Sequence, residues 1–287
     1  MKITPMANEF GTFVDELDLS HQVSESVMQT LCDALYKYRV VCVRGQNFTR
    51  DSYLRFGRQM GQPIAHVLDH MRMRGYPQLM TVGNTEPRDR DNKIRNGAAL
   101  WHTDQSYEAI PARATMLFSL IAPVAGGETQ FCDMARAYDA LDNAMQARID
   151  ALQMAHKYGH GKRRDGELDV NPIINIDQDA RVPPVYHPLV LRHPVTGRPS
   201  LYALGHGAHA IHGMTDGEAH DLIEALKDHA LQERFIYRHK YAPGQLVIWD
   251  TLQTMHSATP IAPLRSRNNA RLLWRISVRG RPAALAP

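Results

Sequence analysis

The segment Trp101-His102-Thr103-Asp104 places two side chains that can bind metal at alternating positions. In an extended segment residues i and i+2 project to the same side, so His102 and Asp104 can reach one metal ion together while Thr103 turns away. A second histidine from elsewhere in the chain would complete a set of two imidazoles and one carboxylate. This set is typical of mononuclear iron sites that keep three coordination positions open. His-x-Asp is common by chance, and an ordinary surface strand is the alternative interpretation.

His256 is the candidate for the second histidine. It follows the predicted strand 244–249 across a short connection, and strands that are distant in sequence pair with each other in a jelly roll. Arg271 comes next, and Arg275 stands four residues later. An iron oxygenase that uses a 2-oxoacid needs a cation for the far carboxylate of that cosubstrate, and the planar fork of arginine binds a carboxylate bidentately. The order His-x-Asp, long gap, His, short gap, Arg is more specific than any of its parts.

The elements that must position these residues are predicted from apolar periodicity and turn residues. Four amphipathic helices are expected, beginning at Ser24, Thr49 and the capping box Thr215-x-x-Glu218, with one more from about 134 to 152. Short apolar runs predict strands at 39–44, 115–120, 129–132, 188–191, 200–202, 244–249 and 271–278. Many short strands with a few helices predict a mainly β fold with peripheral helices and a jelly-roll core.

Two stretches lack strong periodicity. Residues 63–98 are rich in His, Met and charge, and we interpret them as an irregular, lid-like insertion over the site. Residues 159–184 carry many charges and are interpreted as a flexible excursion. No linker or repeat divides the sequence, so we expect one domain over residues 1–287.

Composition limits the classes of function. The 287 residues are 44% hydrophobic, enough for a sizeable core, and the formal net charge of +3 is too small to indicate a nucleic-acid partner. The sequence shows no apolar run of membrane-spanning length and no secretion signal, so a cytoplasmic protein without a membrane partner is expected. Cys32, Cys42 and Cys132 are widely spaced in apolar surroundings, which indicates buried thiols.

The chain resembles the TauD/TfdA family, the taurine and phenoxyacetate-herbicide dioxygenases that depend on Fe(II) and 2-oxoglutarate. The resemblance runs from about residue 39 to Arg275, and several passages are nearer to the herbicide-degrading branch. The passages that carry it are WHTD at 101–104, GGETQFCDM at 126–134, AYDAL at 137–141, HPVTGR at 193–198, and YRH at 237–239 leading to WD at 249–250.

The resemblance implies a double-stranded β-helix (jelly-roll) core and assigns roles position by position. His102, Asp104 and His256 match the iron ligands. Thr129 and Arg271 match the residues that hold a carboxylate of 2-oxoglutarate. Two further positions match residues near the substrate, Arg275 at its anionic group and His66 in the taurine branch. Trp249 is expected to pack beside the site.

The chain also departs from the family pattern. Relatives often have Trp-Asp-Asn-Arg where this chain has Trp-Asp-Thr-Leu at 249–252, and the spacing from His256 to Arg271 is longer by a few residues. Alanines at 98–99 replace an asparagine of the taurine branch, and Asp69 stands about where that branch has a substrate tyrosine. These changes leave the iron chemistry intact. They direct the search for the substrate to the stretch around His66 and to residues 251–255.

The resemblance implies an oxidoreductase that binds Fe(II), 2-oxoglutarate and O₂. It would oxidise, by hydroxylation, an unactivated C–H bond of a small carboxylate or sulfonate, releasing succinate and CO₂. Relatives self-associate, so a homo-oligomer is expected. One alternative is a biosynthetic desaturase of the same family acting on an amino-acid-derived intermediate such as an isonitrile. The other is a non-catalytic jelly-roll binding protein, which the intact triad and arginine argue against.

Overall fold

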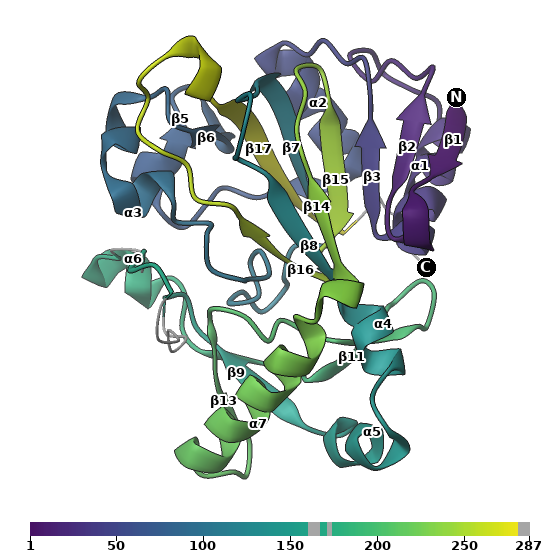
Figure 1. The fold of residues 1–287 in the computed structure, drawn as a ribbon, viewed down its shortest axis with the longest axis vertical. Coiled ribbons are helices and arrows are strands. Elements are labelled where there is room, and N and C mark those ends of the chain that lie inside the picture. The colour runs from purple at the N-terminus through teal and green to yellow at the C-terminus, as the bar shows by residue number, and fades with distance from the viewer. Residues whose placement is uncertain (160–166, 171–173, 281–287) are drawn as a thin grey trace.

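A nine-stranded sheet forms one layer of the protein in the computed structural model, which describes residues 1–159, 167–170 and 174–280 (Figure 1). Its strand order is β1-β2-β3-β15-β7-β17-β6-β5, and β4 pairs with β17 beside β6. The bounds of these strands are β1 Lys2–Pro5, β2 Thr12–Asp15, β3 Val40–Val43, β4 Gln62–Pro63, β5 Arg72–Met73, β6 Tyr76–Gly83, β7 Ala114–Ile121, β15 Leu246–Asp250 and β17 Leu272–Arg279.

A smaller sheet faces this layer. Its order is β14-β8-β16, and its strands are β8 Thr129–Asp133, β14 Ile236–His239 and β16 Thr254–Ala258. Phe131 of β8 packs in one buried cluster with Trp249 of β15 and Leu273 of β17. Side chains alternate between the two faces of a strand, so Leu273 and Arg275 share the face of β17 that lies toward the smaller sheet, and Arg271 immediately precedes this strand. The predicted jelly-roll architecture is confirmed by the relatives described below.

Two helices cover the outer face of the large sheet. α1 (Glu25–Tyr38) begins at the predicted cap Ser24, and α2 (Arg50–Met60) begins at Thr49, whose side chain accepts a hydrogen bond from the backbone of Ser52. Trp274, Ile276 and Val278 of β17 belong to the cluster that these helices complete. β17 is therefore apolar on the helix side and carries its arginine at 275 on the side toward the smaller sheet.

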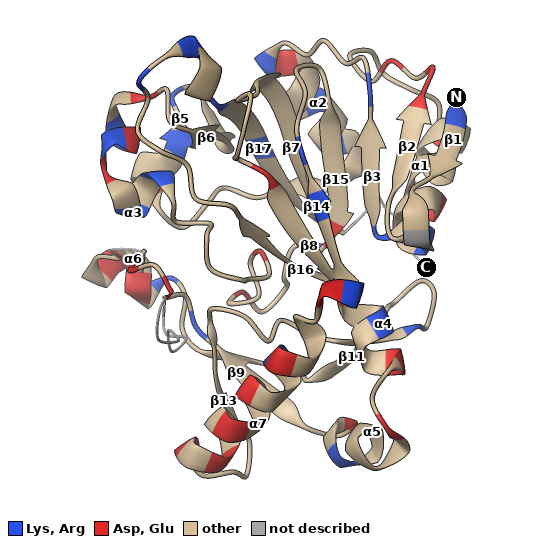
Figure 2. Cartoon of the chain, viewed as in Figure 1, with Lys and Arg blue, Asp and Glu red and all other residues tan. Residues whose placement is uncertain are grey.

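A further group of elements packs behind the smaller sheet. They are β9 Gln153–His156, β10 Val185–Pro188, β11 Val190–Arg192, β12 Pro199–Leu201, β13 Ala208–Ile211, and the helices α4 Met134–Asp139, α5 Asn143–Ile149 and α7 Asp216–Ala230. α7 has the predicted capping box. The prediction of one helix over 134–152 is wrong, because Asp142 caps a new helix by accepting a hydrogen bond from Met145 N. Acidic side chains predominate along α7, whereas both signs of charge lie near α3 (Asn92–Arg95) (Figure 2).

The prediction that residues 63–98 are irregular is wrong for β6, which pairs with β17 over 80–83. The rest of that stretch is short helical turns and loops that contribute to a cavity described below. Part of the predicted excursion 159–184 lies outside the described residues, and its described end contains α6 (Ile176–Ala180). Cys32, Cys42 and Cys132 are buried free thiols, as predicted. Among the described residues, no helix has the length and apolar character to span a membrane.

Candidate metal and cosubstrate site

Backbone pairing brings His102 and His256 together although 153 residues separate them in the sequence. The N–H of each donates to the carbonyl oxygen of the other, both at 2.9 Å, so the chain at His102 extends the free edge of β16. The centroids of the two imidazole rings lie 4.1 Å apart. The strand that holds His256 was not predicted, because TMHSA at 254–258 has no strong apolar alternation.

Asp104 completes the predicted group of three. Its Oδ1 lies 3.9 Å from His102 Nε2 and its Oδ2 lies 3.6 Å from His256 Nε2. One ligand atom from each residue falls within 4.8 Å of the other two. Asp104 Oδ2 is buried and has no hydrogen-bond partner among the described residues. An orphaned buried carboxylate oxygen between two imidazoles fits a bound cation.

The protonation states of the ligands also suit a metal. His102 Nδ1 lies 2.6 Å from the carbonyl oxygen of Leu100, which fixes its proton there and leaves Nε2 as an acceptor. Burial, reinforced by neighbouring His102, lowers the pKa of His256 to about 3, so this imidazole is neutral near pH 7. Burial opposes ionisation of Asp104, but Arg275 and the two histidines lower its pKa well below the usual range. The site thus offers the Asp104 carboxylate, the neutral imidazole of His256 and the Nε2 atom of His102.

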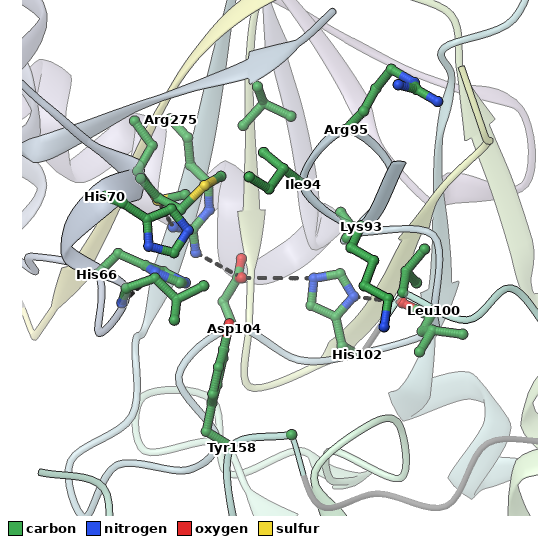
Figure 3. Close-up of a pocket in the computed structure, with 18 of the residues that line it drawn as sticks. His66, His70, Lys93, Ile94, Arg95, Leu100, His102, Asp104, Tyr158 and Arg275 are labelled. Carbon is green, nitrogen blue, oxygen red and sulfur yellow. Dashed lines mark hydrogen bonds and ion pairs between the residues drawn. The ribbon is translucent and has the colours of Figure 1, made fainter. Parts of the chain in front are cut away.

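Arg275 lies beside the metal-ligand group and contacts Asp104. Its Nη2 is 2.7 Å from Asp104 Oδ1, and its Nη1 contacts the sulfur of Met80 at 3.3 Å (Figure 3). A thioether is a weak acceptor, so this nitrogen can donate to a stronger one. The ion pair with Asp104 was not predicted, because the sequence placed Arg275 only at the anionic group of the substrate.

Arg271 lies four residues before Arg275 in the sequence, and its side chain is buried. It is 2% exposed, and its Nε donates to the carbonyl oxygen of Gly127 at 3.1 Å. Its guanidinium carbon is 5.6 Å from the ring centroid of Tyr241, whose hydroxyl lies 2.9 Å from Thr129 Oγ1. Among the described residues, no carboxylate forms an ion pair with Arg271 and no acceptor is bonded to its Nη atoms. Glu128 acts on Arg271 only at longer range, and a buried cation without a carboxylate in direct contact favours an anionic ligand.

The backbone and side chain of Arg271 are tightly packed by neighbouring residues. A β-carbon at Gly127, where φ is +74°, would lie 3.0 Å from Arg271 Cδ. Asn84 Oδ1 accepts a hydrogen bond from the backbone N–H of Arg271, and its amide nitrogen donates to the carbonyls of Ala262 and Asn269. Tyr241 and Asn84 were not predicted. Both lie just beyond strand ends in loops, where no periodicity marks them.

A cavity of about 470 Å³ opens beside the metal ligands, within the usual size range of small-molecule sites. Its wall includes the following apolar residues: Leu68, Met71, Met80, Val82, Ile94 and Leu100. His102, Asp104 and Arg275 lie at its base, with His66 and His70 on the Arg275 side and α3 opposite (Figure 3). Arg271 and Thr129 do not line it. The predicted substrate residues, Arg275 and His66, therefore line the cavity, whereas the predicted 2-oxoglutarate residues lie behind it.

His66 lines the cavity as a neutral imidazole. Its Nδ1 accepts a hydrogen bond from Leu68 N at 3.1 Å, so the proton resides on Nε2. Burial, with a further contribution from Arg275, lowers its pKa to about 3. The 63–98 stretch therefore contributes to the site.

The other expectation for substrate recognition, residues 251–255, is wrong. None of these residues lines the cavity, because they are buried behind the metal group. The carbonyl of Leu252 accepts a hydrogen bond from Ser200 Oγ, and the side chain of Gln253 donates to Tyr36 O. Trp249 packs beside the site as expected, with its ring 4.8 Å from that of His256.

Jelly-roll sheets that enclose two histidines and a carboxylate, open to a cavity, define the class of mononuclear metal-dependent oxygenases. The model of the "Taurine catabolism dioxygenase TauD, TfdA family" matches residues 2–277, and the chain belongs to this family. The resemblance predicted from the sequence is therefore confirmed. The chain is a 2-oxoglutarate-dependent dioxygenase, and its His-Asp-His group fits the Fe(II) that such enzymes use together with 2-oxoglutarate and O₂.

Some relatives are named for phenoxy acids. The chain is 32% identical to an (S)-phenoxypropionate/alpha-ketoglutarate-dioxygenase of Sphingobium herbicidovorans, covering 98% of this chain and 96% of that one. It is 30% identical to an alpha-ketoglutarate-dependent 2,4-dichlorophenoxyacetate dioxygenase of Cupriavidus pinatubonensis, covering 88% and 90%. A crystal structure of AAD-2 in complex with Mn(II) and N-oxalylglycine superposes with a TM-score of 0.80 at 30% identity, covering 97% and 98%.

Proposed function

We propose that this enzyme oxidises a C–H bond of a small organic anion, using Arg271 and Thr129 for 2-oxoglutarate and Arg275 and His66 for the substrate. The observation that carries the proposal is the enclosed Arg271, a buried cation without a carboxylate partner among the described residues. 2-Oxoglutarate can supply that partner with its far carboxylate. Thr129 Oγ1 can donate to the same group, since Tyr241 is its only recorded side-chain partner among the described residues.

The iron would be held by His102, Asp104 and His256. When bound, iron and 2-oxoglutarate couple decarboxylation of the 2-oxoacid to oxidation of a C–H bond. The protein contributes orientation: the backbone pairing of His102 with His256 and the buried Asp104 fix the ligand atoms before anything binds.

Arg275 and His66 would recognise the anionic group of the substrate. Arg275 presents Nη1, whose only acceptor among the described residues is a thioether, and His66 presents its protonated Nε2. The apolar cavity wall would then hold the body of the molecule and keep water from the target bond. Two of the relatives are named for phenoxypropionate and 2,4-dichlorophenoxyacetate, which combine a carboxylate with an apolar body.

Succinate formation across a panel of aryloxyacids, other carboxylates and sulfonates tests the proposal, with the product mass recorded for each. Arg275→Met is the matched variant, because it keeps the length of the side chain and removes the charge. We expect the wild type to turn over at least one anion, and KM for that anion to rise about 10- to 100-fold in Arg275→Met. Succinate formation without preference for anions, unchanged in Arg275→Met, would contradict the proposal.

The product mass separates the possible outcomes of oxidation. One added oxygen atom indicates hydroxylation, which we propose. Loss of two hydrogen atoms would indicate the desaturase instead. No succinate with any compound, together with no visible absorption band on anaerobic addition of Fe(II) and 2-oxoglutarate, would favour a non-catalytic binding protein.

A further inference from the structure

Gln105 and Tyr107 follow Asp104 in a turn that borders the cavity, and the iron and 2-oxoglutarate roles proposed above do not use them. Both line the cavity, and both are more than nine-tenths buried, at 2% and 7% exposed. Gln105 has φ +52°, a left-handed conformation that is unfavourable for a residue with a β-carbon. Such strained positions cluster at ligand-binding sites.

Two polar atoms of this pair lack a hydrogen-bond partner in the described part of the chain. Gln105 Oε1 and the Tyr107 hydroxyl are both buried without a hydrogen bond among the described residues. Burying an amide or a hydroxyl without a hydrogen bond costs free energy, so an unmatched donor and acceptor in one cavity wall favour a polar ligand. The amide of Gln105 is near enough to influence the ionisation of Tyr107, but the two do not reach hydrogen-bond geometry.

Tyr107 lies close to the reacting end of the cavity. Its ring packs edge-on against Tyr158, with centroids 4.8 Å apart, and Tyr158 packs edge-on against His66 at 6.0 Å. Figure 3 shows Tyr158 directed toward Asp104. Burial raises the pKa of Tyr107, and the charges of Arg275 and Asp104 also act on it. The phenol therefore keeps its proton and remains a donor near the base of the cavity.

We infer that Gln105 and Tyr107 form a subsite for a hydroxyl group, so the preferred substrate is an organic anion that also carries a hydroxyl group on its body. A hydroxyl is the smallest group that can accept from the Tyr107 O–H and donate to Gln105 Oε1 at once. An ether or ketone could only accept, and it would leave Gln105 unmatched. This inference rests on the proposed function, in which Arg275 holds the anionic group.

The test compares matched aryloxyacids: phenoxyacetate, its three ring-hydroxylated isomers, and 4-methoxyphenoxyacetate, which can only accept. Binding is measured by calorimetry on enzyme loaded with Mn(II) and N-oxalylglycine, so that turnover does not enter. We expect at least one hydroxylated isomer to bind about tenfold more tightly than phenoxyacetate, and the methoxy compound to show no such gain.

Tyr107→Phe and Gln105→Met should each abolish the preference for the hydroxylated isomer over phenoxyacetate, because each removes one hydrogen-bond partner of the substrate hydroxyl. Tyr202→Phe is the matched control: its hydroxyl is also buried without a partner among the described residues, but Tyr202 does not line the cavity. Circular dichroism of each variant confirms folding. Equal binding of all the ring-substituted acids, or a preference that survives both substitutions, overturns the inference and leaves the proposed function intact. Failure of every anion to bind overturns the proposed function and the inference with it.

Discussion

The two arginines of the site, Arg271 and Arg275, have different surroundings. At Arg271 the side chain is enclosed by Gly127 and Tyr241, and no part of it lines the cavity. Arg275 lies four residues further along the chain, within β17, and its side chain borders a cavity of about 470 Å³. The metal ligands lie at the Arg275 end, and Thr129 lies behind them on β8.

The difference lies in what surrounds each arginine. The Arg271 end is built from strands and their immediate ends, with glycine and asparagine contacts that leave little freedom. Much of the wall at the Arg275 end comes from loops and short helices in the 63–98 stretch, together with Tyr158, Val170 and Gln178. A rigid, closed end suits a ligand that stays the same through the family, and loops that can vary suit a substrate that differs. Four substitutions test this contrast, from the largest expected effect to the smallest.

Asp104→Ala removes the ligand on which both ends depend. Loss of one metal ligand should reduce succinate formation about a thousandfold or more, since metal-ion catalysis contributes several kcal/mol. Bound iron, measured after dialysis, should fall with it. His21→Ala changes an exposed histidine and serves as the control. Full activity in Asp104→Ala would mean that the metal is held elsewhere.

Gly205→Ala tests how the chain at His102 is held. A β-carbon at this position would lie 2.8 Å from His102 Cα and closer still to the carbonyl oxygen of Trp101, so the ligand segment must shift. We expect iron affinity to fall about 10- to 100-fold, as when residues that orient metal ligands are changed. Gly217→Ala, on α7, has nothing within 4 Å and should bind iron normally. Equal iron affinity in the two variants would show that this close approach is unimportant.

Gly127→Ala crowds the Arg271 end alone. The new methyl group would lie 3.0 Å from Arg271 Cδ, so KM for 2-oxoglutarate should rise about tenfold while KM for the substrate stays constant. Gly126→Ala is a close control, because its φ of +75° imposes the same strain in open space. Both variants should lose about 1 kcal/mol of unfolding free energy. A rise in KM of equal size in both variants would assign the effect to backbone strain.

Tyr241→Phe should have the smallest effect. It removes the hydroxyl that contacts Thr129 and keeps the ring beside Arg271, so KM for 2-oxoglutarate should rise about threefold. Tyr237→Phe removes a hydroxyl that contacts His239 instead and should leave this KM unchanged. A change in KM for the substrate, without a change in KM for 2-oxoglutarate, would place Tyr241 at the substrate end of the site and contradict this prediction.

The contrast also separates what the sequence could predict from what it could not. His102, Asp104 and Arg271 were predictable because strand alternation and chain order constrain residues in sheets. β6 was missed since its residues, YPQLMTVG, mix turn formers with apolar ones. The cavity wall, with Gln105 and Tyr107, depends on loop conformations that no periodicity encodes. Pairing of Arg275 with Asp104 required the register of β17 against the rest of the sheet.

Anaerobic titration of 2-oxoglutarate into Fe(II)-loaded enzyme, followed by the visible absorption of the chelate, tests the central claim most directly. It is made on wild type, Arg271→Met and Arg275→Met, which are the same substitution at two positions four residues apart, one just before β17 and one within it. If Arg271 holds the far carboxylate, the dissociation constant should rise about 10- to 100-fold in Arg271→Met and stay within about twofold of wild type in Arg275→Met. Equal weakening in both variants, or weakening in Arg275→Met alone, would contradict the division of the site into a closed cosubstrate end and an open substrate end.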